Sequence, residues 1–366
     1  MSSLIKFSLL PEMFLMLIFF SCDNSDAPWK DATPDDALSP VFISGQNFVT
    51  KEGDTLRFWG MNAGIAHGTL MEDEWETEDK MVSLIGDLED MKSLGANLVR
   101  IHLQYHQFMK GPEEVDQAAV DRLKYYVSRA EETGLYLDVT GLGSYRREDP
   151  GWYESMTEQE RWATQALFWK NIAAAVGDSP AVFCFNLMNE PAVASGGGMD
   201  WIPDKAFDDF YFVQNIALDK LGRSTEEVFE AWIGKMTEAI REEDPHTLIT
   251  LGMLPFSNMA KMGKYLDFIS LHIYPRAGEE EEASRLIRDF QSDQPLLVEE
   301  IFPLYMSPED LAEFIRREKK WSSGWVGHYF GENIEDLTPP EDEKESLTKT
   351  WLEIFQEMAE EMKSKP

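Results

Sequence analysis

The chain has 366 residues, 43% of them hydrophobic, which is enough for one large α/β domain and excludes disordered and fibrous classes. The 67 Asp and Glu residues against 33 Lys and Arg residues give a formal net charge of −34. Such a surface repels polyanions, so nucleic acid is excluded as a partner. With two cysteines, Cys22 and Cys184, no disulfide framework is predicted.

The first 22 residues resemble an export signal. Lys6 precedes an apolar stretch over 13–20, which is too short to cross a membrane but suits the hydrophobic region of a signal. A small residue then stands before Cys22, as at a bacterial lipoprotein cleavage site, so we predict that Cys22 is lipidated. An ordinary cleaved signal with an incidental Cys is the alternative. Both predict export, either to the periplasm or cell surface as an anchored lipoprotein or as a secreted protein.

The next segments are predicted to be a tether followed by a single folded domain. Residues 23–40 are rich in Asp, Ala, Ser and Pro, a composition that cannot bury enough apolar surface to become ordered. The domain covers 41–366. It begins with a hairpin over 41–49, in which a Gly-containing turn separates two apolar runs. We expect this hairpin to plug the bottom of a barrel.

Eight short β-rich runs then alternate with longer amphipathic helical patterns, which is typical of repeated βα units around a parallel sheet. Helices are predicted over 81–94, 116–133, 157–176 and 225–243, among others. Eight such units account for the chain, and no Gly-x-Gly-x-x-Gly follows the first run, so a (β/α)8 TIM barrel is favoured over an open doubly wound sheet. The strands are predicted over 56–61, 97–103, 134–140, 181–188, 247–252, 267–273, 295–300 and 325–330.

The unit after the fourth strand is enlarged. Residues 192–223 contain a Gly-rich turn and several aromatic residues before the next helix. Long insertions after barrel strands lie on the catalytic face and shape specificity. We predict that Trp201 lines a cleft there, whereas packing outside the barrel is an equal alternative for the Phe and Tyr residues.

Two of the apolar strands end in carboxylic acids. The fourth leads into Asn189-Glu190-Pro191, and the seventh leads into Glu299-Glu300. Active sites of parallel barrels are built at the carboxyl ends of the strands. Cleavage of a glycosidic bond needs two carboxyl groups there, one protonated and one ionised. The two strand ends therefore predict a glycosidase.

These motifs make the chain similar to glycoside hydrolase family 5, the cellulase- and mannanase-like members of a clan of retaining (β/α)8 enzymes. The resemblance implies that Glu190 is the acid/base and that Asn189 hydrogen-bonds the sugar 2-hydroxyl. It also implies that the nucleophile is the Glu five residues after Pro295, which selects Glu300 over Glu299. Because adjacent strand residues face opposite ways, we expect only one of these two to enter the barrel mouth.

The resemblance runs from about Phe48 over most of the chain, including the strand-one, strand-two and strand-six patterns. It implies that Arg100 supports the nucleophile and that His272 and Tyr274 flank the two acids. The residues alone agree, since a guanidinium and a phenol beside Glu300 favour its ionised form. A structural ion pair for Arg100 and a satisfied core histidine for His272 are the alternatives.

Two strands depart from the family pattern, which bears on the substrate more than on the chemistry. Strand three has Asp138-Val139-Thr140 where the family has Asp-Leu-His, so we expect His102 or His106 to replace the missing imidazole. Strand eight lacks the family's platform Trp, and His328 or Tyr329 is expected there. Other candidates for sugar contacts, with core packing as the alternative for each Trp, are Trp59, Asn62, His67, Trp75, Tyr145 and Trp152.

No metal or cofactor is predicted, because the His residues lack ligand spacing and there is no Cys/His cluster. The sequence thus predicts a retaining glycoside hydrolase that acts on a β-linked polysaccharide or oligosaccharide by double displacement. Its expected partner is a carbohydrate, and a lipid anchor is the only expected membrane contact. A non-catalytic glycan-binding lipoprotein and an envelope transglycosylase are the alternatives.

Overall fold

The computed structural model describes residues 38–63, 78–145, 150–196, 198–203, 211–255 and 258–364. The predicted signal with Cys22, most of the tether and the candidates His67 and Trp75 lie outside these residues. No helix of the described segments is long and apolar enough to span a membrane.

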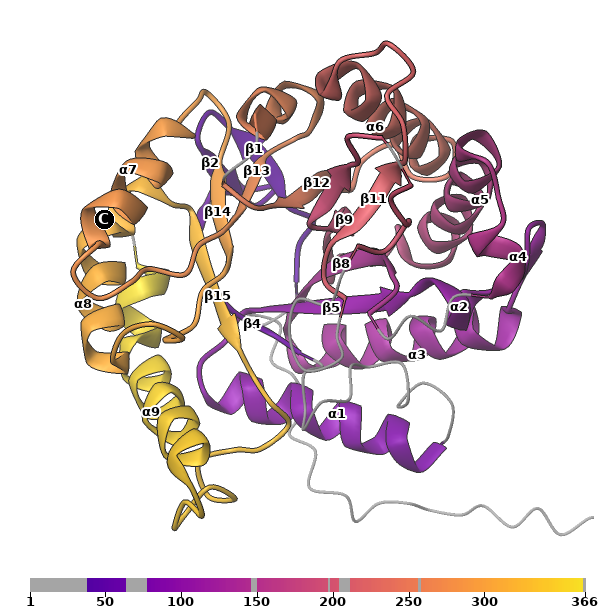
Figure 1. The fold of residues 1–366 in the computed structure, drawn as a ribbon. Helices are drawn as coiled ribbons and strands as arrows, with labels where there is room; N and C mark the ends of the chain where they lie inside the picture. Colours follow the sequence, from indigo (N-terminus) through magenta and orange to yellow (C-terminus); the bar gives the residue numbers. More distant parts are fainter. Residues whose placement is uncertain are drawn as a thin grey trace, which may run out of the picture.

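Within the described part of the chain, eight parallel strands close into a barrel (Figure 1). Each barrel strand overlaps one of the eight predicted runs, so the predicted (β/α)8 fold is confirmed. In order around the barrel, the strands are β4 (Phe58–Asn62), β5 (Leu98–Gln104), β8 (Tyr136–Gly143), β9 (Val182–Asn189), β12 (Leu248–Met253), β13 (Ile269–His272), β14 (Leu296–Glu300) and β15 (Gly324–His328).

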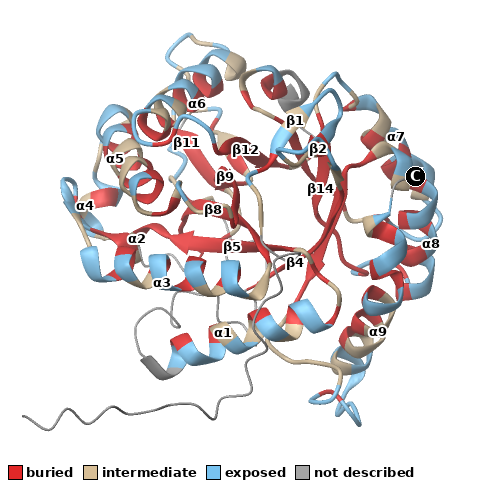
Figure 2. Ribbon diagram, turned by 180° about the vertical axis from the view of Figure 1, so that it is seen from behind, coloured by how far each residue is buried: buried red, intermediate tan, exposed pale blue. Residues whose placement is uncertain are grey.

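Helices surround the barrel with buried faces toward the strands and exposed faces outward (Figure 2). Their ends follow local signals: Thr157 and Ser224 form capping boxes with the Glu three residues on, and Gly134 ends its helix in a left-handed conformation at φ 72°. The longer helices are α1 (Glu78–Ser93), α3 (Gln117–Thr133), α5 (Glu158–Val176), α6 (Thr225–Arg241), α7 (Glu280–Asp289), α8 (Pro308–Glu318) and α9 (Glu343–Lys363), and the 3-10 helix η3 (Asn258–Tyr265) follows β12.

The N-terminal hairpin closes one end of the barrel. Its two strands are β1 (Phe42–Ser44) and β2 (Asn47–Val49), and the short β3 (Thr55–Leu56) extends it to three strands. The ring of Phe48 is fully buried, with its centroid 5.0 Å from the rings of both Phe183 and Phe268. The predicted plug is therefore confirmed, and the opposite end of the barrel is left for a site.

Shorter elements lie in the connections between the barrel strands and the longer helices. The enlarged unit after β9 contains a two-stranded parallel sheet, which confirms the predicted insertion. The short elements are α2 (Tyr105–Phe108), β6 (Met109–Gly111), β7 (Glu114–Val115), α4 (Gly151–Glu154), β10 (Pro191–Val193), β11 (Gln214–Ala217) and η4 (Lys319–Trp321).

Two predicted sugar-binding aromatics face away from the barrel axis. The indole of Trp59 stacks on Phe355 of α9 at 4.3 Å and donates from Nε1 to the Phe355 carbonyl. The hydroxyl of Tyr329 donates to Asp90 of α1 over 3.1 Å. Because side chains alternate along a strand, both rings fill the space between strand and helix. The prediction that they line the site was wrong.

Two other tryptophans pack against neighbouring side chains. The ring of Trp152 lies 5.8 Å from that of Tyr153 and is partly buried. One face of Trp201 is covered by the guanidinium of Arg161, which lies 4.4 Å from the ring centroid. Arg161 is itself buried and also lies over the Tyr153 ring, so it joins α4, α5 and the loop after β10. Trp201 makes none of the hydrogen bonds around the two predicted acids.

Candidate active site

The two predicted acids meet at the open end of the barrel. Glu190 follows β9 directly, at a φ of 46° that non-Gly residues rarely adopt, and its N–H donates to the Gly252 carbonyl. Glu300 ends β14. His272, at the end of β13, lies between them: its Nδ1 is 2.8 Å from Glu190 Oε1 and 3.4 Å from Glu300 Oε2. One oxygen of each acid and one nitrogen of His272 all lie within 4.8 Å of one another.

Arg100 of β5 holds one side of this group. It is fully buried and donates from Nη1 to Glu300 Oε1 over 2.6 Å and to Asn62 Oδ1 over 2.9 Å. Its Nη2 donates to Asn189 Oδ1 over 2.8 Å, and its Nε donates to Thr140. Burial alone would lower the pKa of Arg100, but the charges of Glu299 and Glu300 outweigh it and raise that pKa. Arg100 is therefore a fixed cation that orients four neighbours.

Glu300 is an ionised carboxylate in this setting. Burial by itself would raise the pKa of Glu300, but the charges of His272 and Arg100 and a 2.7 Å hydrogen bond from the Tyr274 hydroxyl hold it well below its usual range. Burial and the neighbouring Glu300 raise the pKa of Tyr274, so the phenol keeps its proton. These are the properties that a nucleophilic carboxylate requires.

His272 carries a positive charge at neutral pH. Its burial would lower its pKa, but Glu300 and hydrogen bonds with Glu190 and Glu299 raise the pKa to about 10. Both ring nitrogens then donate, Nδ1 toward the two acids at the surface and Nε2 toward Glu299 below, over 3.1 Å. The imidazolium thus connects three carboxyl groups.

Glu299 and Glu300 both turn toward the barrel interior, although adjacent strand residues ordinarily face opposite ways. In the ladder with β13, Leu271 pairs with Val298 and His272 pairs with Glu300, so Glu299 is an extra residue in the register. Such a bulge breaks the alternation of side chains, and both carboxylates contact Arg100. They differ in access: the Glu299 side chain is 0% exposed, whereas that of Glu300 is 11% exposed. Only Glu300 can meet a substrate.

The match to known families agrees with this geometry. Residues 51–292 match the model of "Cellulase (glycosyl hydrolase family 5)". The chain belongs to glycoside hydrolase family 5. The predicted family is thus confirmed, and so, at the level of the family, is the prediction of a glycosidase.

Solved structures similar to this family 5 chain share its fold at low sequence identity, and no curated protein matches it. An exo-β-1,4-mannosidase from Opitutaceae bacterium strain TAV5 is 18% identical with a TM-score of 0.64, over 88% of this chain and 62% of that one. The chain therefore spans less than two thirds of that mannosidase. A β-glucanase from Saccharophagus degradans is 15% identical with a TM-score of 0.59, over 93% and 99% of the two chains. A β-mannanase from the blue mussel Mytilus edulis is 14% identical with a TM-score of 0.56, over 88% and 96%.

This family 5 chain lacks the usual His on strand three and the usual Trp on strand eight, and two neutral histidines, His102 and His328, lie at the site. His102 Nδ1 lies 2.7 Å from the Tyr145 hydroxyl and its Nε2 lies 3.4 Å from Asn62 Oδ1. Burial and the charge of Arg100 hold the pKa of His102 well below its usual range. His106 lies apart in α2. His328 Nε2 lies 3.2 Å from the Tyr274 hydroxyl, and burial lowers the pKa of His328 to about 4.

Gly252 is a site residue that sequence reasoning missed. A Cβ placed on it would lie 2.8 Å from Glu299 Oε2, 2.9 Å from His272 Nε2 and 3.1 Å from Arg100 Nη2. Its N–H donates to Asn186 and its carbonyl accepts from Glu190. A Gly at the end of a strand pattern was the available signal, since it marks a close approach of side chains to the backbone.

We therefore expect Gly252→Ala to damage the site while the fold persists. The added methyl group displaces three charged side chains, which should lower kcat/KM by about 10²-fold and the free energy of unfolding by about 1–3 kcal/mol. The matched control is Gly234→Ala on the exposed face of α6, where a Cβ meets nothing within 4 Å. That change should stabilise the protein by about 0.5–1 kcal/mol and leave the kinetics unchanged. Equal kinetics for the two variants would contradict the role of Gly252.

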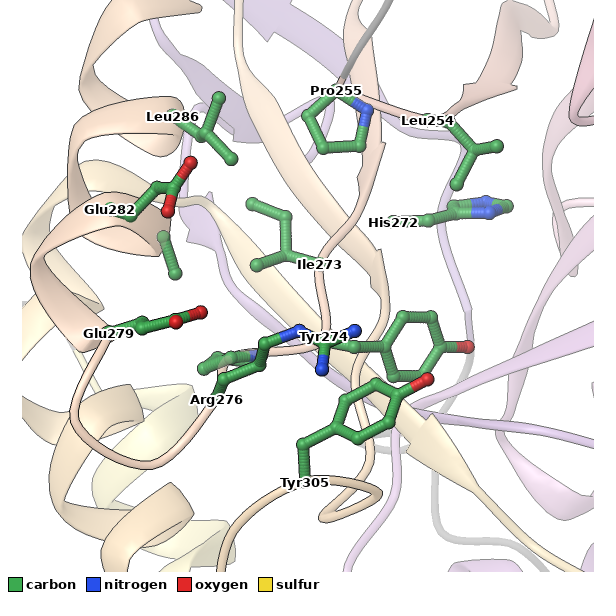
Figure 3. Close-up of a pocket in the computed structure, with 12 residues that line it drawn as sticks. Leu254, Pro255, His272, Ile273, Tyr274, Arg276, Glu279, Glu282, Leu286 and Tyr305 are labelled. Atoms are coloured by element: carbon green, nitrogen blue, oxygen red, sulfur yellow. The ribbon is translucent and has the colours of Figure 1, made fainter.

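A cavity of about 270 Å³ opens beside the acids (Figure 3). His272 and Tyr274 form one wall, so the cavity begins at the two side chains that contact Glu190 and Glu300. Arg276 and Tyr305 lie together at its edge, with the guanidinium 4.1 Å from the ring centroid. Tyr305 is 49% exposed. The cavity thus offers an aromatic face within reach of the acids.

Proposed function

We propose that the protein is a retaining glycoside hydrolase that cleaves a β-linked polysaccharide or oligosaccharide by double displacement. The observation that carries the proposal is the short separation of the two acids, one oxygen of each lying within 4.8 Å of the other. Retaining enzymes place their two carboxyl groups about 5 to 5.5 Å apart, whereas inverting enzymes leave about 6.5 to 9.5 Å for a water molecule.

In the first step, Glu300 attacks the anomeric carbon while Glu190 protonates the departing glycosidic oxygen. A covalent glycosyl–Glu300 intermediate forms and the leaving sugar departs. In the second step, Glu190 takes a proton from water as the water oxygen attacks the anomeric carbon, which releases Glu300. Arg100 and Tyr274 stabilise the ionised Glu300 before the first step, and they stabilise it again when the second step releases the carboxylate. Asn189, oriented by Arg100, is placed to donate to a sugar hydroxyl next to the reacting carbon.

The proposed substrate class is supported by the family and by the structural neighbours. The neighbours are described as a β-1,4-mannosidase, a β-mannanase and a β-glucanase. We infer a β-linked mannan, glucan or related oligosaccharide as the substrate of this chain. Export and anchoring through Cys22 are also part of the proposal, on the strength of the motif at residues 13–26.

The test of the proposal is the stereochemistry of the product. The purified protein is mixed with a panel of β-mannans, β-glucans and aryl β-glycosides, and the first anomer released is observed by proton NMR. We expect the β-anomer to appear first, with mutarotation following. Initial release of the α-anomer would refute the double displacement. Glycan binding without any product would favour a binding lipoprotein, and transfer to an added sugar in place of water would favour a transglycosylase.

Tyr305 is expected to bind a sugar ring of longer substrates. Tyr305→Ala should raise KM for a polysaccharide by roughly tenfold, which corresponds to about 1.4 kcal/mol of binding free energy, because the aromatic face at the cavity edge is lost. A small aryl glycoside that occupies only the position next to the acids should keep its KM. Tyr125→Ala is the matched control, since Tyr125 is 53% exposed on α3 and outside the cavity. Equal KM values for all three proteins would show that the cavity binds no sugar.

A further inference from the structure

Two carboxyl groups lie in direct contact beneath the candidate catalytic pair. Asp138 of β8 and Glu299 of β14 are both 0% exposed, and they are near enough that each shifts the pKa of the other. Asp138 Oδ2 and Glu299 Oε1 find no partner among the donors of the described residues. Two ionised carboxylates have no hydrogen to place between them, so a hydrogen bond between these oxygens requires that one of the groups is protonated.

We propose that Asp138 and Glu299 share a single proton carried by Asp138, and that the resulting Glu299 anion keeps His272 doubly protonated beneath Glu190 and Glu300. The proton-sharing pair follows from the buried contacts alone. Its consequence for catalysis rests on the proposed function. Glu299 is in this view a positioning residue, since its side chain is sealed from substrate and acts through His272.

The contacts decide which partner holds the proton. Glu299 Oε2 faces two cations, His272 Nε2 at 3.1 Å and Arg100 Nη2 at 3.5 Å. Among the described residues, no cation lies within hydrogen-bonding distance of Asp138, whose Oδ1 accepts from the Thr140 hydroxyl at 3.3 Å and whose side chain also contacts the Cys184 thiol. Opposite charges stabilise the ionised form, so the anion belongs on Glu299.

The directions of the pKa shifts agree with this assignment. Burial, followed by the charge of Glu299, raises the pKa of Asp138 well above its usual range. Burial alone would also raise the pKa of Glu299, but Arg100 and His272 outweigh it and lower the pKa of Glu299.

The pair places His272 at the centre of a chain of proton-bearing groups. Asp138 donates to Glu299, Glu299 accepts from His272 Nε2, and His272 Nδ1 donates toward Glu190. The titratable and charged groups in the cluster around His272 and the pair are Arg100 from β5, Asp138 from β8, Cys184 from β9, Glu190 after β9, Tyr274 after β13, Glu299 and Glu300 from β14, and His328 from β15.

Removing the Glu299 charge should shift the acidic limb of the pH profile of activity to higher pH. Without that anion His272 loses its proton at a lower pH and becomes neutral. The imidazole of His272 contacts both acids directly, at 2.8 Å from Glu190 and 3.4 Å from Glu300. The loss of that cation therefore dominates, and Glu300 holds its proton to a higher pH. We expect the acidic limb of the profile of Glu299→Gln, which reports the ionisation of Glu300, to move up by about one pH unit.

Asp138→Asn is the matched variant. Its amide donates to Glu299 as a protonated Asp138 does, so both limbs should stay at their wild-type pH, whatever happens to the rate. If Asp138 were instead ionised in the wild type, this substitution would remove a charge next to Glu299 and move the limbs. Limbs that move in Asp138→Asn, or an acidic limb that stays in place in Glu299→Gln, would overturn the proposal.

A spectroscopic readout separates this proposal from the proposed function and does not need activity. The chain has 6 His residues, so the ¹⁵N side-chain signals of histidine-labelled protein can be resolved, with His272→Gln to assign one of them. At neutral pH we expect a doubly protonated His272 in the wild type and in Asp138→Asn, and a neutral one in Glu299→Gln. A neutral His272 in the wild type refutes the pair even if the protein is an active glycosidase. An imidazolium in an inactive protein refutes the function and leaves the pair standing.

Difference infrared spectra cover the case in which Glu299→Gln does not fold. The wild type should show carbonyl bands of protonated carboxyl groups at a pH where exposed acids are ionised, and the proton of Glu190 in the proposed mechanism would contribute one of them. Asp138→Asn should remove a band that Glu190→Gln keeps. Spectra in which Asp138→Asn removes no band would place the proton elsewhere and overturn the proposal.

Discussion

Glu300→Ala is expected to lower kcat by on the order of 10⁴-fold or more, because the covalent intermediate can no longer form. Arg100 and Tyr274 remain in place around the vacated position, since each has other partners: Arg100 contacts Asn62 and Asn189, and Tyr274 contacts His328. The space left by the carboxylate can therefore admit a small anion. Azide should restore turnover of aryl β-glycosides and give the α-glycosyl azide, the product of one inverting displacement.

Glu299→Ala is the control for this result. Its activity should also fall, because Arg100 and His272 lose a counter-ion. Azide should not restore it, since the vacated position lies below the acids and is sealed from solvent. Rescue of Glu299→Ala but not of Glu300→Ala would show that the nucleophile is the neighbouring residue. Mass spectrometry of protein trapped with a 2-fluoro glycoside gives an independent answer, with the label expected on Glu300.

The activity that Glu190→Ala loses is expected to depend on the leaving group of the substrate. General acid catalysis contributes about 10² to 10⁴-fold, and a polysaccharide needs that proton because its leaving group is a poor one. We expect kcat/KM for polysaccharide to fall by this factor and that for an activated aryl glycoside to fall much less. The pH profile should lose its basic limb, since no acid remains whose ionisation ends activity.

Azide distinguishes Glu190→Ala from Glu300→Ala. In Glu190→Ala the glycosyl–Glu300 intermediate still forms, and azide then attacks it from the other face, so the product should be the β-glycosyl azide. The two variants should thus give opposite anomers. Equal losses for good and poor leaving groups, together with no azide product, would exclude Glu190 as the acid/base.

The amino-acid sequence by itself determined the barrel, its plug and the strand ends that carry the acids. These features are local, because strand and helix periods, capping residues and turn glycines act over a few positions. The Asn189-Glu190-Pro191 run and the acids after Pro295 could therefore be assigned to their strands before any contact was known. Arg100, His272 and Tyr274 were expected from the resemblance to the family, and the structure brings all three against the two acids.

Only the tertiary structure decided how neighbouring side chains share the barrel interior. The bulge at Glu299 depends on the register between β13 and β14, so the alternation of a regular strand does not reveal that both acids turn inward. Trp59 and Tyr329 were misplaced for a related reason: α9 and α1 supply the partners that hold these rings outside the barrel, and no local pattern reveals such contacts. The contact of Asp138 with Glu299 joins residues more than 150 positions apart. Closing the barrel brings these strands together. Two negative charges are costly in its interior of low polarity, so a shared proton allows both groups to be buried.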